Sequence, residues 1–490
     1  MKNSMLFGLL FCVAIINAQT SSLLNLASGD MQMFTPIYEE DNNIYGYFSL
    51  FKLDQLSKNE EKYEYVILDK NLNKVANGEF VDTEYAGVYS RYYMPDKIGD
   101  NLILTKSYAN MNGSVAFTST RMLLLNDNTI QKPFYFEDQN LKKGFRPVEK
   151  LKKVQRNVKF VNVPIGVNNG YVVIELRKKM TKEYPNNIYY YNLDHEKIWD
   201  YSFGDIQRKS AYGLESFDEE VLYFSYTTND HRNTNVKLLR FDASSGEVTF
   251  DYLLEDIHSK YNYDYTLKRI NDKTVLTGKI SPYSVTGYDY NKAVGLFKIV
   301  LDAQGNEVFK KHFLWEEAGE YIEMSRTGRL EAGYKLRVKS YFIFKDESIV
   351  VLAEKFKIGQ NLLLGAIAKT TDFVLMEFDE KFNLKNAQTI NKDLSKFSSS
   401  DFLFAQYLND EKDAVFFYQD YQKDSETKDK NWILGIVSIV GGQINHEKIP
   451  MSSDEFFIHP YIAKEGYILL REFNKNSDFD EIRLEQLNLN

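Results

Sequence analysis

The chain has little cysteine, little proline and few apolar runs. Cysteine occurs once in 490 residues, at position 12, and proline nine times. A single cysteine excludes an intrachain disulfide scaffold and a multi-cysteine metal site. The sequence also lacks a His-Glu-x-x-His metal pair, a Gly-x-Ser-x-Gly elbow, a phosphate-cradling Gly-x-x-x-x-Gly-Lys and a dinucleotide-binding Gly-x-Gly-x-x-Gly after a strand. We therefore expect no cofactor and no metal, and no catalytic residue can be assigned from a motif.

Aromatic residues are abundant instead, with 35 Tyr and 34 Phe making up most of a 15% aromatic content. Such residues stabilise β-sheets through cross-strand pairs, so the composition favours sheet over helix. The net charge of −9 is small for this length and is spread along the chain. We therefore expect no nucleic-acid partner, since nucleic-acid binding needs a concentrated basic surface.

The N-terminus has the three parts of a signal peptide. Lys2 supplies the charge, residues 5–16 the apolar core, and residues 16–18 a small-residue cleavage site. The apolar core is too short for a membrane span, which needs roughly 20 residues. Lipoprotein processing at Cys12 is disfavoured because the preceding Phe11 is bulky. Removal of residues 1–18 takes the charge from −9 to −10 and leaves a cysteine-free mature chain without a transmembrane segment. We expect this chain to be exported, to the periplasm or outside the cell.

An internal repeat organises the rest of the chain. In residues 295–308 an apolar strand ends at Asp302, a tight turn follows at Gly305 and Asn306, and a second strand begins. Each repeat has two central strands, flanked by one strand before and one after. The central pairs are 44–53 with 63–69, 101–107 with 121–127, 170–177 with 188–194, 221–227 with 236–242, 274–280 with 295–302, 348–356 with 373–379, 413–420 with 432–438, and 466–473 with 481–489.

Eight four-stranded antiparallel units predict a β-propeller. One such sheet cannot bury both faces alone, and radial packing around an axis solves this. The 472 residues after position 18, divided by eight, give 59 per unit. The eighth unit lacks a fourth strand, and we expect residues 22–28 to supply it and to close the ring. The prediction is an all-β chain with a single propeller domain over residues 19–490. Seven blades, or two separate β domains, remain as alternatives.

The strand ending in Leu301 and Asp302, followed by the Gly-Asn turn, resembles the repeat of exported β-propeller proteins over nearly the whole mature chain. The resemblance implies a fold and no activity, because the phrase is widespread among propellers. A Trp-Asp dipeptide occurs only once, at Trp199 and Asp200, and the Ser-x-Asp-x-Gly-x-x-Trp box of some glycosidases is missing.

Length variation falls on one face of the predicted propeller. The turns between third and fourth strands are short. The long segments are the blade crossings 142–159 and 315–337 and the hairpin loops 282–292, 357–371 and 421–431. Loops on a rigid scaffold often carry function, so we expect a ligand or protein partner on this face.

The crossing 142–159 is strongly basic. Three of its apolar residues, at 148, 151 and 154, predict a short docked helix. The charges predict a site for an anionic ligand, or else a solvated helix face. The candidate ligand-binding residues are Arg146, Lys150, Lys152, Lys153 and Arg156.

Two further candidate ligand-binding residues are Arg91 and Trp315. Arg91 lies among tyrosines on a strand expected to line the axis. These residues could stack on a sugar or bind a carboxylate, or else belong to ordinary blade packing. Trp315 begins the crossing 315–337, whose acids come early and bases late, as suits a helix. That crossing would either cover the central channel or pack on neighbouring blades.

Three other patterns have structural alternatives. The apolar run 361–368 is either a partner surface or an extension of its flanking strands. The alternating Asn474, Asn476, Asp478 and Asp480 favour a polar hairpin over a calcium loop. Five repeated aspartates are expected to form turns, namely Asp69, Asp194, Asp242, Asp302 and Asp379.

The sequence therefore favours an exported, non-enzymatic binding or scaffold propeller with a protein, anionic or glycan partner. The alternative is an exported hydrolase of glycans or peptides, with acidic residues gathered at the central channel.

Overall fold

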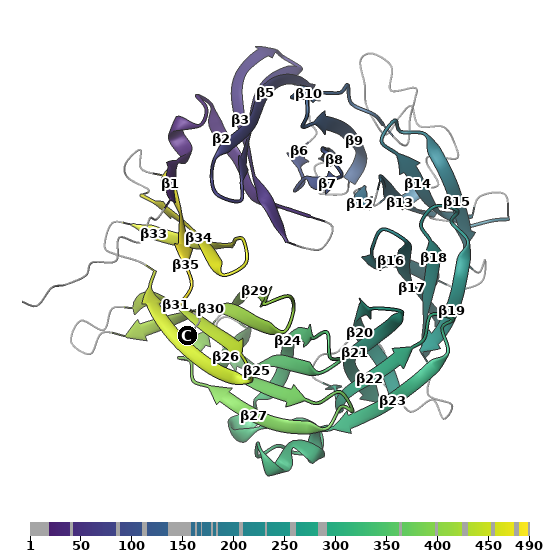
Figure 1. Ribbon diagram of the computed structural model, residues 1–490, viewed down its shortest axis with the longest axis vertical. Coiled ribbons are helices and arrows are strands. Elements are labelled where there is room, and N and C mark those ends of the chain that lie inside the picture. The colour runs from purple at the N-terminus through teal and green to yellow at the C-terminus, as the bar shows by residue number, and fades with distance from the viewer. Residues whose placement is uncertain are drawn as a thin grey trace, which may run out of the picture.

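The structure is a computed structural model. It describes residues 19–39, 43–84, 89–109, 115–135, 158–161, 164–167, 169–177, 180–182, 185–204, 209–230, 233–254, 261–282, 292–361, 365–396, 400–423, 430–451, 456–474 and 480–488. The strands of these residues form eight antiparallel sheets arranged radially around one axis (Figure 1). The predicted eight-bladed β-propeller is confirmed.

The first four blades follow the chain in order. Blade 1 contains β2 (Asp30–Tyr38), β3 (Ile44–Ser57), β4 (Glu60–Asp69) and β5 (Lys74–Thr83). Blade 2 contains β6 (Tyr89–Tyr92), β7 (Asp96–Ile98), β8 (Asn101–Ala109), β9 (Val115–Leu124) and β10 (Thr129–Ile130). Blade 3 contains β11 (Val158–Val161), β12 (Ile165–Val167), β13 (Gly170–Arg177), β14 (Asn186–Asn192) and β15 (Lys197–Phe203). Blade 4 contains β16 (Lys209–Phe217), β17 (Val221–Asp230), β18 (Asn233–Asp242) and β19 (Val248–Leu254).

The other four blades complete the ring. Blade 5 contains β20 (Tyr261–Ile270), β21 (Lys273–Pro282), β22 (Gly295–Leu301) and β23 (Glu307–Leu314). Blade 6 contains β24 (Lys335–Ile343), β25 (Ile349–Asn361), β26 (Gly365–Phe378), β27 (Leu384–Ile390) and the short β28 (Ser395–Lys396). Blade 7 contains β29 (Phe402–Leu408), β30 (Asp413–Lys423), β31 (Lys430–Val440) and β32 (Gln443–Pro450). Blade 8 contains β33 (Phe457–Ile462), β34 (Tyr467–Phe473), β35 (Asp480–Gln486) and β1 (Gln19–Ser22).

Buried apolar side chains form one cluster at each junction between neighbouring blades, eight clusters in the described part of the chain. Each sheet therefore buries both faces. This explains why central strands are continuously apolar: all seven residues of β22 are buried. A strand with one solvated face would alternate instead.

The N-terminal strand closes the ring, but at a different place from the one predicted. Strand β1 pairs with β35 from Gln19 opposite Leu484 to Ser22 opposite Glu481. Of the predicted closing strand, residues 22–28, only Ser22 belongs to β1, and a 3₁₀ helix, η1 (Leu23–Asn25), follows it. Leu23 is fully buried between blades 8 and 1, and Leu26 packs against the same cluster. A spacing of three suits a 3₁₀ turn, whereas a strand would send these two residues to opposite faces.

Several of the turns between third and fourth strands are built on a side-chain acceptor. The Asp302 carboxylate accepts backbone N–H groups from Gln304 and Asn306, at 2.9 and 2.8 Å. Asp69, Asp242 and Asp379 accept backbone N–H groups in the same way. These predicted turn formers are confirmed.

Asp194 is the exception, because Asn192 holds that turn. The Asn192 side-chain oxygen accepts the backbone N–H groups of Asp194 and Glu196, at 3.0 and 2.9 Å. The prediction for Asp194 is therefore wrong by two residues. An amide oxygen accepts hydrogen bonds as a carboxylate does, so Asn can hold the first position.

The crossing from blade 5 to blade 6 packs between these blades and does not cover the channel. It contains two 3₁₀ helices, η3 (Trp315–Glu320) and η4 (Glu331–Gly333). Leu330 and Tyr334 are buried in the cluster between the two blades. The Tyr321 hydroxyl donates to the Leu384 carbonyl at 3.5 Å, which places the crossing beside β27 on the outer rim (Figure 1). The suggested channel cover is therefore wrong, because the crossing buries Leu330 and Tyr334 between the two blades and reaches β27 at the outer rim.

Two segments predicted as loops, 357–371 and 421–431, are strand in their described residues. Strands β25 and β26 are 13 and 14 residues long and carry most of the apolar run 361–368 into their hairpin. In the segment 421–431, β30 continues to Lys423 and β31 begins at Lys430. The strand-extension alternative therefore holds for the described residues of 361–368.

Candidate functional site

The predicted basic residues cannot be placed. Arg146, Lys150, Lys152, Lys153 and Arg156 all lie in 136–157, outside the described residues. Anion binding by this crossing stays a prediction. Of the suggested calcium ligands, 476 and 478 lie outside the described residues too, and Asp480 forms a bidentate ion pair with Arg471 at 2.6 and 2.8 Å.

The structure does not bring Arg91 and Trp315 together. Arg91 lies on β6, the inner strand of blade 2, and is exposed, with its guanidinium carbon 4.9 Å from the ring centroid of Tyr93. Trp315 is 2% exposed, and its indole N–H donates to the Ala293 carbonyl at 2.9 Å. Trp315 therefore belongs to the core between blades 5 and 6, where its ring has no face open to a ligand.

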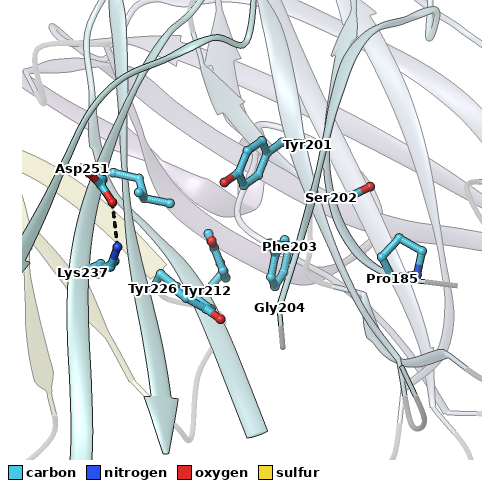
Figure 2. Close-up of a pocket in the computed structure, with 10 residues that line it drawn as sticks. Pro185, Tyr201, Ser202, Phe203, Gly204, Tyr212, Tyr226, Lys237 and Asp251 are labelled. Carbon is cyan, nitrogen blue, oxygen red and sulfur yellow. Dashed lines mark hydrogen bonds and ion pairs between the residues drawn. The ribbon is translucent and has the colours of Figure 1, made fainter. Parts of the chain in front are cut away.

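A site that the sequence did not reveal lies between blades 3 and 4. Figure 2 shows it as a pocket with aromatic walls. We call it the tyrosine pocket. Its volume is 390 Å³ and its lining residues are Pro185, Tyr201, Ser202, Phe203, Gly204, Tyr212, Tyr226, Lys237, Leu239 and Asp251. These residues lie where β15 ends, β16 begins and β17 ends, on the face of the blade crossings and the long hairpin loops.

Strand register creates the aromatic wall. Tyr212 on β16 is directly opposite Tyr226 on β17, so both side chains point to the same face of blade 4. Their ring centroids are 4.6 Å apart. The last residue of β15, Phe203, is buried, and its ring centroid lies 3.7 Å from that of Tyr212. The wall therefore joins two blades that are adjacent only because the propeller has formed.

Polar groups lie around this wall. Lys237 and Asp251 form an ion pair at 2.7 Å on one side of the pocket (Figure 2), and both side chains are partly exposed. On the other side, the Ser202 hydroxyl donates to the Asn187 side-chain oxygen at 2.7 Å. Burial raises the pKa of Tyr212, and the neighbouring Tyr201 and Tyr226 add to this rise, so the phenol stays protonated across the physiological range. The pocket thus combines apolar ring faces with hydroxyl and charged hydrogen-bonding groups.

This arrangement suits binding of a small ring-shaped ligand. Ligand pockets typically occupy roughly 300–1,000 Å³ and pair an apolar lining with a few placed polar groups. The only carboxylate among the lining residues is Asp251, and it is paired with Lys237. Across the residues that the structure describes, no three His, Cys, Asp or Glu side chains gather in a way that could hold a metal ion.

Only composition could have pointed to this site from the sequence. The tyrosines at 201, 212 and 226 belong to three strands of two blades and follow no local motif. Their proximity depends on strand register and on the order of the blades, neither of which a motif search detects.

Among the described residues, no helix has both the length and the apolar character needed to cross a bilayer.

Solved structures with a similar fold have very different sequences. A europium-containing methanol dehydrogenase is 10% identical, with a TM-score of 0.42, and the match covers 92% of this chain and 84% of that one. The polysaccharide lyase Uly1 is 8% identical, with a TM-score of 0.38 and coverages of 95% and 91%. The β-propeller domain of the trilobed protease from Pyrococcus furiosus is 10% identical, with a TM-score of 0.36 and coverages of 82% and 96%. Likeness at this level says nothing about what this chain does.

No curated protein matches the chain. One family model does, and it matches residues 1–400, well over half of the chain. The chain therefore belongs to this family, a family of unknown function (DUF6770).

Proposed function

We propose that this protein is an exported binding protein that holds a sugar residue of a glycan in the tyrosine pocket. The observation that carries the proposal is the aromatic wall of Phe203, Tyr212 and Tyr226 beside the Lys237–Asp251 ion pair. The pocket lies on the face where the long loops were expected to carry function.

The ligand class follows from the two kinds of surface in the pocket. A sugar ring has an apolar C–H face and a rim of hydroxyl groups. Aromatic rings such as those of Tyr212 and Tyr226 present a large apolar face, and a tyrosine hydroxyl adds a polar end. Lys237 can donate to sugar hydroxyls and Asp251 can accept from them, since each is only partly covered.

Binding is proposed rather than hydrolysis because of the carboxylates in the pocket. Glycosidases generally use two carboxyl groups on either side of the scissile bond. The tyrosine pocket has one, Asp251, whose charge is balanced by Lys237.

Export is proposed from the sequence, in which residues 1–18 carry the charge, apolar core and small-residue cleavage site of a signal peptide. The closing strand β1 (Gln19–Ser22) lies after the predicted cleavage site, so cleavage there would leave its pairing with β35 intact. Intact-mass measurement of protein recovered from its native host tests this: loss of residues 1–18 is expected, and a full-length mass would contradict export by this signal.

Binding is tested by thermal shift and titration calorimetry against a panel of neutral and acidic oligosaccharides. A ligand that binds only the folded state raises the melting temperature. We expect Tyr212→Ala and Tyr226→Ala each to weaken binding about tenfold, as loss of an aromatic contact costs about 1 kcal/mol beyond the lost area. Tyr212→Phe should retain most of the affinity, because it keeps the ring.

The control is Tyr321→Ala, which removes a tyrosine that is 42% exposed on the crossing between blades 5 and 6. It should leave glycan binding unchanged. A glycan whose affinity is the same for the wild type and for both alanine variants would bind elsewhere, and that result would overturn the assignment of this pocket.

A further inference from the structure

The tyrosine pocket crosses every strand of blade 4. Its lining includes Tyr212 on β16, Tyr226 on β17, Lys237 and Leu239 on β18, and Asp251 on β19 (Figure 2). Neighbouring strands lie about 4.8 Å apart, so the lining extends over about 14 Å from the innermost strand of the blade to the outermost. A single sugar ring is shorter than this span, whereas a short chain of linked sugar rings can follow it.

One row of side chains runs along this direction. Tyr212 is directly opposite Tyr226, Tyr226 is directly opposite Lys237, and Lys237 is directly opposite Leu253 on β19. Residues directly opposite each other in antiparallel strands point to the same face of a sheet. That face is the one toward blade 3, because Tyr212 and Tyr226 pack against the apolar cluster between blades 3 and 4. Leu253 is therefore the outermost member of the row that begins with the two tyrosines.

The outer end of this row is open to solvent. On β19, Phe250 and Leu254 are buried between blades 4 and 5. Because successive side chains of a strand alternate between its faces, Asp251 and Leu253 lie on the other face, beside the pocket. The side chains of Lys237 and Asp251 are 39% and 55% exposed, and Leu253 is 38% exposed. The pocket thus continues at its outer end into an apolar surface that nothing covers in the described part of the chain.

We propose that the tyrosine pocket is the inner part of a groove that binds an extended oligosaccharide across blade 4. This inference rests on the proposed glycan binding and adds the length and course of the ligand. One sugar lies on the rings of Tyr212 and Tyr226, and the next bonds through its hydroxyls to Lys237 and Asp251. The chain then leaves the blade over Leu253, which contacts the apolar face of the outer sugar.

Titration calorimetry on the mature full-length chain tests the length of the ligand. The probes are cello-, chito- and mannuronate oligosaccharides of one to four sugars. For the sugar type that binds, we expect the affinity to rise about tenfold or more from one sugar to three. The added sugars contribute apolar contact and hydrogen bonds, whose net effects together reach this factor. The fourth sugar should add little, because it would lie beyond β19.

Substitutions on β19 test the course of the chain. Leu253→Ser should lower the ratio of trisaccharide to monosaccharide affinity at least about fourfold, the effect of losing contact with one methylene group. Leu253→Tyr should raise this ratio, because it adds an aromatic face for the outer sugar. A folding defect could not produce such a gain. The control is Val248→Ser, which removes a side chain that is 37% exposed at the other end of β19, and it should leave the ratio unchanged.

Two results would overturn the extended groove and leave the proposed function standing. One is equal affinity for one sugar and for three, and the other is the same affinity ratio in the wild type and in both Leu253 variants. In either case Tyr212→Ala would still weaken the binding of every length alike. If no ladder binds the wild type at millimolar concentration, both the groove and the glycan-binding function are contradicted.

Discussion

Gln19 lies directly opposite Leu484 in the antiparallel pair of β1 and β35, so the two ends of the described chain share one sheet. Removal of residues 19–22 would leave β35 as an open edge. We expect the free energy of unfolding in urea to fall by about 2–4 kcal/mol, for a few net hydrogen bonds of about 1 kcal/mol each. Aggregation should also rise, because an unpaired strand edge can pair with another chain.

A matched variant separates main-chain pairing from side-chain identity. Replacing residues 19–22 by four threonines keeps a strand-forming segment, and it should retain the wild-type unfolding midpoint. If the deletion unfolds at the same urea concentration as the wild type, β1 does not contribute to ring closure.

The third-to-fourth turn of blade 3 gives a paired prediction. Asn192→Ala removes the acceptor of two backbone N–H groups, from Asp194 and Glu196. It should lower the free energy of unfolding by about 1–2 kcal/mol. Asp194→Ala should change it little, since the Asp194 backbone N–H is kept. Equal effects of the two substitutions in urea unfolding would contradict this account of the turn.

This turn also shows how far sequence reasoning reached. Leu193-Asp194 has the same form as Leu301-Asp302, so the repeat predicts the acceptor of this turn at Asp194, two residues after the true one. The number of blades could be predicted because every sheet buries both faces and therefore repeats an apolar strand. The closing strand could not be bounded correctly, because residues 19–22 are Gln-Thr-Ser-Ser and carry no apolar signal.

The side-chain contacts between neighbouring strands and blades could not be predicted from the sequence. Tyr212 and Tyr226 meet through strand register, and Gln406 donates to the carbonyls of Ala463 and Tyr467 across the junction of blades 7 and 8. The sequence placed loops and turns on separate faces, but it could not show which side chains converge between blades.

Phe382 combines full burial with a strained backbone. It has a φ of 56° at the fourth position of the turn that begins with Asp379, and its ring stacks on Phe378 with centroids 4.5 Å apart. Phe382→Ala should lower the free energy of unfolding by about 3–5 kcal/mol, as for other buried phenylalanines. Phe382→Gly should lower the free energy of unfolding by about 1 kcal/mol less than Phe382→Ala does, because glycine adopts positive φ without strain.

Phe378 provides the control, since it lies in β26, does not have a positive φ, and contacts the same ring. At position 378, replacement by glycine should lower the free energy of unfolding by about 0.5–1 kcal/mol more than replacement by alanine. Urea unfolding of the four variants gives both differences. If glycine is worse than alanine at position 382 as well, strain at that turn does not affect stability.

A buried charge cluster between blades 1 and 2 should make stability depend on pH. Asp82 is 2% exposed and pairs with Arg121 at 2.8 Å and with Lys106 at 3.5 Å. Lys106 is 1% exposed and lies over three tyrosine rings, including that of Tyr92 at 5.0 Å. Lys106→Met should lower the free energy of unfolding by about 3–5 kcal/mol. The substitution leaves Asp82 paired with Arg121 alone and removes the ion pair between Lys106 and Glu84.

The dependence of the free energy of unfolding on pH, at acidic pH, tests the same cluster through Asp82. Burial alone would raise the pKa of this carboxyl, but Lys106, Arg121 and the hydrogen bond from Tyr92 outweigh burial and hold it below its usual value of 3.8. In the unfolded chain the group takes up its proton at higher pH than in the folded chain. Its stabilisation is therefore complete above the unfolded pKa and is lost as pH falls through the lower folded pKa.

The difference in free energy of unfolding between the wild type and Asp82→Asn should be constant from about pH 5 upward and should shrink below about pH 4. Urea unfolding at several pH values between these limits and below measures it. A difference that stays the same down to the acid end would show that Asp82 is not held ionised by its two cations.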